Sequence, residues 1–113
     1  MPKGILYVET RPASPEQAAA YHEWYDRTHL PEVCALEGFV SARRFVPVDP
    51  EDHGACIAIY ELDAPDLVAA RDGLNAALAA GELDVQPVTC MDPPPVVRVL
   101  ALHSGYPRTG ARS

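Results

Sequence analysis

Apolar residues recur with two different periods along the 113-residue chain, and these periods predict six elements. Short runs rich in β-branched and aromatic residues are typical of strands, which we expect at residues 4–9, 39–48, 55–62 and 96–103. Two longer segments with apolar residues every three to four positions predict helices, at residues 15–30 and about 65–80. We expect Asp63 to be the N-cap of the second helix. The predicted order is therefore β-α-β-β-α-β.

This order predicts an α+β domain of the ferredoxin-like class, in which two helices cover one face of a four-stranded antiparallel sheet. We expect residues 1–103 to form this single domain, followed by a flexible polar tail at residues 104–113. The third strand is largely apolar on both faces, where Cys56, Ala58, Tyr60 and Leu62 alternate with Ala55, Ile57 and Ile59. A chain this short has no third layer to cover the second face, so we expect a homodimer in which two sheets face each other.

Pro31 is expected to interrupt the first helix, because proline has no N–H to donate to the carbonyl of Arg27. The helix would end at Leu30, and the chain would restart as a short helical turn. His29 would then lie at a helix C-terminus, where the helix dipole favours the protonated imidazole.

The composition is acidic, with 16 Asp and Glu against 9 Lys and Arg and a formal net charge of −7. Nucleic acids and anionic membranes bind basic surfaces, so we expect neither as a partner. No apolar run approaches the ~20 residues of a membrane span. Cys34, Cys56 and Cys90 form no C-x-x-C pair, which favours reduced thiols and a cytoplasmic protein.

His29 is the best candidate for general acid/base chemistry, because the ordinary pKa of histidine lies near neutrality. Asp26 lies three residues earlier on the same side of the helix and is expected to orient the imidazole ring. The alternative is that His29 only caps the carbonyls of the interrupted helix.

A metal site is not expected in this segment. His22, Asp26 and His29 carry suitable ligand atoms, but residues seven apart on a helix are separated by about 10.5 Å along its axis. The chain has no nucleotide-binding glycine motif. We therefore expect no metal and no cofactor.

Aromatic and basic residues supply the remaining candidates for a ligand site. The candidate substrate-binding residues are Tyr21, Trp24, Tyr25 and Tyr60, although the same aromatic stripe is also typical of core packing. Arg43 and Arg44 are adjacent on a strand and must point to opposite faces. Arg43 or a tyrosine hydroxyl is taken as the group that would steady an enolate, and the choice between Arg43 and Arg44 stays open.

Residues 21–45 resemble the EthD-like group of the dimeric α/β-barrel superfamily. The resemblance rests on the pattern W-x-x-x-x-H-x-P, formed by Trp24, His29 and Pro31, and on the pair Gly38-Phe39 that follows. It implies a homodimer with a ligand pocket in each subunit, between the sheet and the helices. It also implies that Trp24, His29 and Pro31 lie near that pocket.

These observations favour a cofactor-free enzyme that moves a proton on a small aromatic or polyketide-like carbonyl compound. Isomerisation, cyclisation, dehydration, decarboxylation and oxygenation are the reaction types that would fit. The alternatives are a non-catalytic dimeric protein that binds a small aromatic or apolar ligand, or assists another enzyme, and a dimer whose interface is itself the function.

Overall fold

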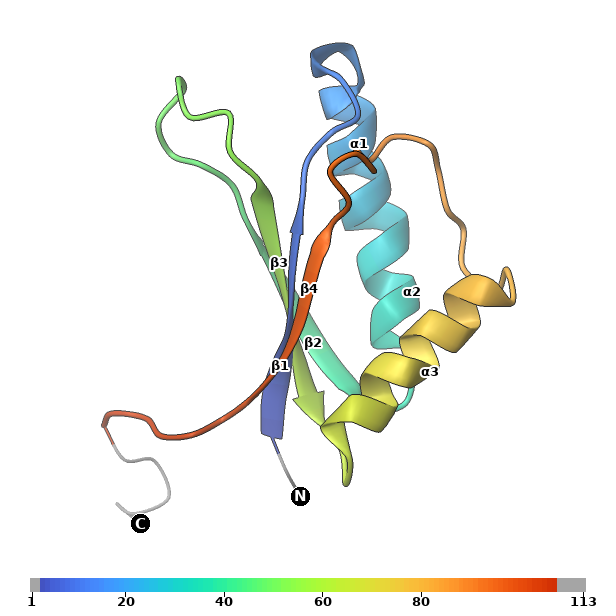
Figure 1. Ribbon diagram of the computed structural model, residues 1–113, viewed down its shortest axis with the longest axis vertical. Helices are drawn as coiled ribbons and strands as arrows, with labels where there is room; N and C mark the ends of the chain where they lie inside the picture. The colour runs from blue at the N-terminus through green and yellow to red at the C-terminus, as the bar shows by residue number, and fades with distance from the viewer. Residues whose placement is uncertain (1–2, 108–113) are drawn as a thin grey trace.

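The computed structural model describes residues 3–107, which form a sheet with helices packed on one face (Figure 1). The sheet is antiparallel with the strand order β2-β3-β1-β4, where β1 is Lys3–Thr10, β2 is Phe39–Phe45, β3 is Cys56–Asp63 and β4 is Val96–Ala101. The expected α+β class and the four-stranded antiparallel sheet are confirmed. β2 and β4 end earlier than the apolar pattern predicts.

The first helical segment runs without interruption past Pro31, so the expected break is wrong. It comprises the 3₁₀ turn η1 (Pro15–Gln17), α1 (Ala18–Trp24), the π-helical turn η2 (Tyr25–His29) and α2 (Leu30–Cys34). In η2 the N–H of Leu30 donates to the carbonyl of Tyr25, five residues earlier. This wider turn changes the hydrogen-bond register just before the proline, and Pro31 then occupies the first turn of α2, where an N–H is not required.

The second helix, α3 (Leu67–Ala79), begins about two residues later than the sequence predicts. Its N-cap is Asp66 and not Asp63, because the Asp66 carboxylate accepts the N–H groups of Val68 and Ala69 at 3.0 and 3.1 Å.

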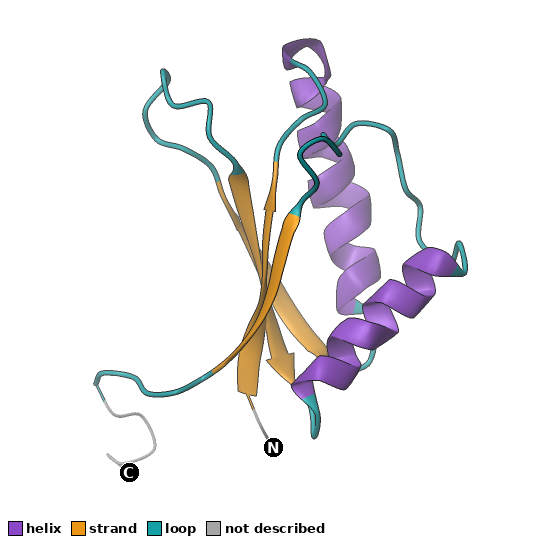
Figure 2. Cartoon of the chain, in the orientation of Figure 1, coloured by secondary structure: helices purple, strands orange, loops and turns teal. Residues whose placement is uncertain are grey.

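Alternation along the strands separates a covered sheet face from an open one. Leu6 and Val8 of β1 and Tyr60 of β3 point toward the helices and form the core with Tyr21 and Tyr25. Figure 2 shows that the helices lie on one side of the sheet, while the other side has no covering layer among residues 3–107.

The part of the chain after β4 extends away from the sheet (Figure 1). Residues 102–107 are exposed, and the rest of the expected tail, residues 108–113, lies outside the described residues. Within residues 3–107, no helix has the length and apolar character needed to span a bilayer.

Candidate functional site

A cavity of about 500 Å³ lies between the covered face of the sheet and the helices. Its sheet wall consists of Leu6, Val8, Thr10, Tyr60 and Val97, and its helical wall of Trp24, Tyr25, His29, Leu74, Asn75 and Leu78. The third wall is the connection between α3 and β4, which contributes Val85, Gln86, Pro87, Thr89, Met91 and Pro95. Cavities of this size hold small organic molecules.

His29 lines this cavity and is held by two aromatic rings. Its imidazole stacks on Trp24 with ring centroids 4.6 Å apart and meets the Tyr25 ring edge-on at 5.0 Å. Burial lowers the pKa of His29 to about 4, so the ring is neutral at physiological pH. The expectation of a protonated imidazole is therefore wrong, because the helix continues past His29 and supplies no C-terminal dipole there.

Asp26 does not orient His29 as predicted. Its carboxylate accepts a hydrogen bond from the Arg44 guanidinium at 2.8 Å, and His29 Nδ1 is buried without a hydrogen-bond partner among the described residues. A second Arg44 nitrogen lies 3.1 Å from Nδ1 of His22, so the Arg44 guanidinium contacts both Asp26 and His22.

Arg44, and not Arg43, points toward the helices, although it does not line the cavity. Its guanidinium packs over the rings of Tyr25, at 4.4 Å, and Tyr21, at 5.3 Å. A register shift between Phe39 and Ser41 reverses the side-chain alternation of β2, which turns Arg44 toward the helices. Arg43 points to the open face with its strand partner Ile59, away from the cavity, and cannot steady an enolate there.

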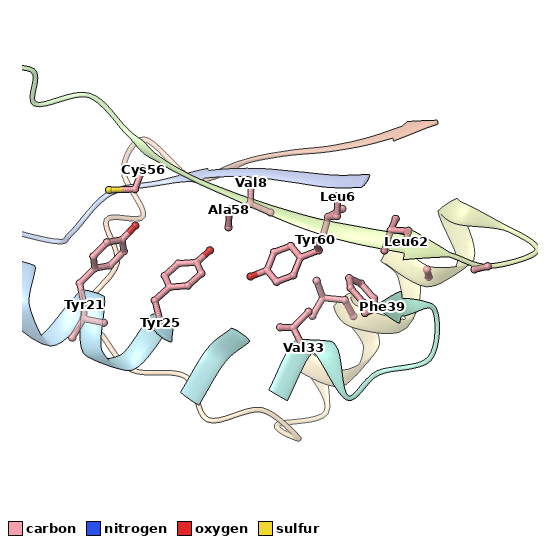
Figure 3. Packing of buried hydrophobic residues seen from close by; sticks show 14 residues of the cluster. Leu6, Val8, Tyr21, Tyr25, Val33, Phe39, Cys56, Ala58, Tyr60 and Leu62 are labelled. Carbon is pink, nitrogen blue, oxygen red and sulfur yellow. The ribbon is translucent and has the colours of Figure 1, made fainter. Parts of the chain in front are cut away.

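The three candidate tyrosines form a row between the sheet and the first helical segment (Figure 3). Tyr21 does not line the cavity; its hydroxyl lies 2.6 Å from Thr10 Oγ1, and burial raises its pKa to about 12. Tyr25 and Tyr60 do line the cavity, and the Tyr60 hydroxyl points toward Tyr25 (Figure 3). Burial raises the pKa of both phenols, so they stay protonated and can donate hydrogen bonds.

Polar atoms without partners are concentrated at this site. Four buried side-chain polar atoms lack a hydrogen-bond partner among the described residues, and three of them belong to the cavity-lining residues His29, Tyr60 and Thr89. An unpaired buried polar group costs about 1–3 kcal/mol. Such groups persist more readily where a ligand can use them.

The connection between α3 and β4 is held against the first helical segment by hydrogen bonds. Trp24 Nε1 donates to the carbonyl of Asp84, and the N–H of Asp84 donates to Glu32 Oε1, both at 2.8 Å. Trp24 therefore contacts this connection with its N–H and His29 with its ring face. Sequence reasoning missed this wall; its prolines signal an ordered loop, but no local pattern places the loop over the sheet.

Metal binding and cysteine chemistry are the remaining candidates in the described part of the chain. No group of three His, Cys, Asp or Glu residues within residues 3–107 could hold a metal ion. Cys34, Cys56 and Cys90 are free thiols, and burial raises the pKa of Cys34, which disfavours its thiolate.

Comparison with known proteins shows the fold of this chain and no more. No protein-family model and no curated protein sequence matches it. The solved structure of Rv0793 from Mycobacterium tuberculosis is similar, with a TM-score of 0.53 over 94% of this chain and 99% of that chain. The sequence identity is 19%, so the similarity is evidence for a small α+β fold alone.

Proposed function

We propose that this protein is an enzyme without a metal or nucleotide cofactor that transfers a proton on an aromatic or polyketide-like carbonyl compound. The observation that carries the proposal is a neutral, partly exposed His29 in a cavity whose wall also offers two protonated phenols. Isomerisation, cyclisation, dehydration, decarboxylation and oxygenation are the reaction types that this arrangement would serve.

In the proposed step, His29 is the base. Its Nδ1 is buried, so we assign Nε2 as the nitrogen that takes a proton from the carbon next to the substrate carbonyl. The electron pair of that C–H bond forms the C=C bond of an enolate, and the π pair of the C=O bond moves onto the oxygen. A hydroxyl of Tyr60 or Tyr25 donates a hydrogen bond to this oxygen. The imidazolium then returns the proton to carbon or to oxygen.

A base with a pKa of about 4 can perform this step where hydrogen-bond donors stabilise the enolate. A low pKa keeps His29 unprotonated at neutral pH, and Trp24 and Tyr25 fix the plane of its ring. Of the two groups first considered for steadying the enolate, we assign the tyrosine hydroxyls, since Arg43 does not line the cavity.

We also propose that the chain belongs to the EthD-like group of the dimeric α/β-barrel, ferredoxin-like superfamily. The Trp24, His29 and Pro31 pattern, the β-α-β-β-α-β order and a cavity between sheet and helices all support this assignment. A homodimer follows from it, with the open sheet faces of two copies packed together. The partly exposed apolar residues of that face support the dimer: Ile5, Tyr7, Ile57, Ile59 and Leu100.

Deuterium exchange tests the enzymatic proposal without knowledge of the natural substrate. The probe is 2-tetralone, an uncharged bicyclic ketone with exchangeable protons next to its carbonyl, and NMR in D₂O follows deuterium incorporation. We expect wild-type protein to accelerate the exchange above the buffer rate and His29→Gln to lose about 100-fold or more of that acceleration. His53→Gln, in the exposed β2–β3 connection, is the matched control and should retain the wild-type rate. An equal rate in wild type and His29→Gln would remove His29 from the mechanism.

A non-catalytic ligand-binding or accessory protein is the second candidate. It is favoured by the absence of a carboxylate partner for His29 Nδ1 among the described residues, because enzymes commonly orient a catalytic imidazole in this way. Binding of 2-tetralone by wild-type protein with exchange no faster than in buffer would support this second function.

A further inference from the structure

We infer that the cavity selects uncharged ligands, namely apolar molecules that carry a neutral hydrogen-bonding group, and rejects the corresponding carboxylates. The inference deepens the proposed function, because it takes the same cavity as the site. It names a property of the ligand that the other proposed reaction types leave open, and it excludes decarboxylation, whose substrate is a carboxylate.

The first observation is the chemistry of the lining. The cavity wall consists of aliphatic, aromatic, proline, hydroxyl and amide side chains, and none of the described residues that line it is an Asp, Glu, Lys or Arg. Its polar members are Thr10, Asn75, Gln86 and Thr89, together with Tyr25, Tyr60 and His29. An anion moved into such a wall loses its hydration without gaining a counter-ion.

The charged groups near the cavity are engaged outside it. Arg44 packs over the ring of Tyr25 and forms an ion pair with Asp26. The Asp26 carboxylate therefore compensates the positive charge of Arg44. Glu32 accepts the N–H of Asp84, and the Asp84 carboxylate accepts a hydrogen bond from the Gln86 side chain at 2.8 Å. The nearby cation is therefore neutralised, and the nearby carboxylates would repel an anion.

His29 completes the neutral wall. Its imidazole is the lining group that could have become a cation near neutral pH, but burial keeps it unprotonated there. The formal net charge of −7 disfavours an anion at longer range as well. We expect the ligand to carry a neutral group that accepts a hydrogen bond from the Tyr60 or Thr89 hydroxyl, or donates one to a ring nitrogen of His29.

Two probes of the same shape test this selectivity at pH 7. Naphthalene-1-carboxamide is uncharged, and naphthalene-1-carboxylate differs from it essentially by one negative charge. Equilibrium dialysis against wild-type protein should give a dissociation constant at least about tenfold lower for the carboxamide. Equal affinities, tighter binding of the carboxylate, or no binding of either probe would overturn the inference.

A charge introduced into the wall tests whether the selectivity is local. Asn75 lines the cavity from α3, and Ala76 is the next residue, exposed and outside the lining. We expect Asn75→Lys to shift the ratio of the two affinities about tenfold in favour of the carboxylate. Ala76→Lys has the same net charge and should bind both probes as wild type does. An equal gain in both variants would assign the selectivity to the overall charge and overturn the inference.

The outcome is separable from that of the proposed function. If the carboxamide is preferred but His29→Gln does not slow the exchange of 2-tetralone, the selectivity stands and the enzymatic role of His29 fails. If His29→Gln does slow the exchange and the two naphthalene probes bind equally, the enzymatic role stands and the selectivity fails.

Discussion

His29 shows how strongly the surroundings of one side chain decide its chemistry. In the sequence it is a histidine before a proline, a position that suggests a helix end and a positive charge. In the fold it is enclosed by Trp24 and Tyr25 within an uninterrupted helical segment, and burial lowers its pKa to about 4. The same residue changes from a candidate cation to a neutral hydrogen-bond acceptor.

This change makes protein stability depend on pH. Because the folded-state pKa of His29 is about 4 and the ordinary value is 6.5, unfolded chains bind a proton between these pH values that folded chains do not. The contribution of His29 is fully present above pH 6.5 and is lost as the pH falls through 4, by roughly 3 kcal/mol. Urea unfolding at pH 4.5 and 7 should therefore show a smaller loss of stability for His29→Gln than for wild type. Between these pH values, His53→Gln should lose as much stability as wild type. If His29→Gln also loses as much as wild type, the assignment of this pH dependence to His29 is disproved.

The tyrosine row provides a matched pair of hydroxyl deletions. The Tyr60 hydroxyl has no partner among the described residues, whereas the Tyr21 hydroxyl is bonded to Thr10. We expect Tyr60→Phe to leave the free energy of unfolding unchanged or to raise it by up to about 1 kcal/mol, and Tyr21→Phe to lower it by about 1 kcal/mol. The exchange of 2-tetralone should nevertheless slow in Tyr60→Phe. Equal destabilisation of both variants would show that the Tyr60 hydroxyl is bonded in solution.

At the residue scale, the sequence indicated the types of residue that line the cavity better than the contacts that each residue makes. His29, Trp24, Tyr25 and Tyr60 line the cavity, whereas Tyr21 of the same aromatic stripe lies in the core. The choice between two adjacent arginines depends on one register shift in β2, and alternation counted from Phe39 selects the wrong member.

The α3–β4 connection is the element that encloses the cavity, and its attachment to the helix can be tested. Glu32→Ala removes the acceptor for the Asp84 N–H, so we expect faster amide exchange over residues 82–88 and a loss of about 1 kcal/mol in stability. Hydrogen–deuterium exchange mass spectrometry measures the first effect. Glu32→Gln keeps an acceptor oxygen and should remain close to wild type. Unchanged exchange in Glu32→Ala would mean that this hydrogen bond does not hold the connection.

At the scale of elements, periodicity located the helices and strands, because burial of one helix stripe or one strand face sets the pattern of apolar residues. The π-helical turn could not be predicted from the sequence. It is accompanied by the packing of Tyr25 against His29, which depends on the tertiary fold and not on a local sequence pattern. The wall formed by the α3–β4 connection escaped for a similar reason: it is held by contacts between residues about 50 to 70 positions apart.

For the whole molecule, the open sheet face is the feature that calls for a partner. We expect sedimentation velocity at micromolar concentration to show a dimer for wild type and a monomer for Ile59→Lys, which places a charge in the middle of that face. Val68→Lys makes the same charge change at an exposed position of α3 and should stay dimeric. A monomeric wild-type protein would contradict the proposed dimer.

The central claim is that neutral His29 is the base of a proton-transfer site, and the pH–rate profile of 2-tetralone exchange tests it most directly. Because His29 must be unprotonated to act, kcat/KM for the wild-type protein should rise through a pH of about 4 and stay level from pH 5.5 to 8. His29→Gln should lack this rise. A midpoint near 6.5, or the same profile in both proteins, would place the base elsewhere and contradict the account.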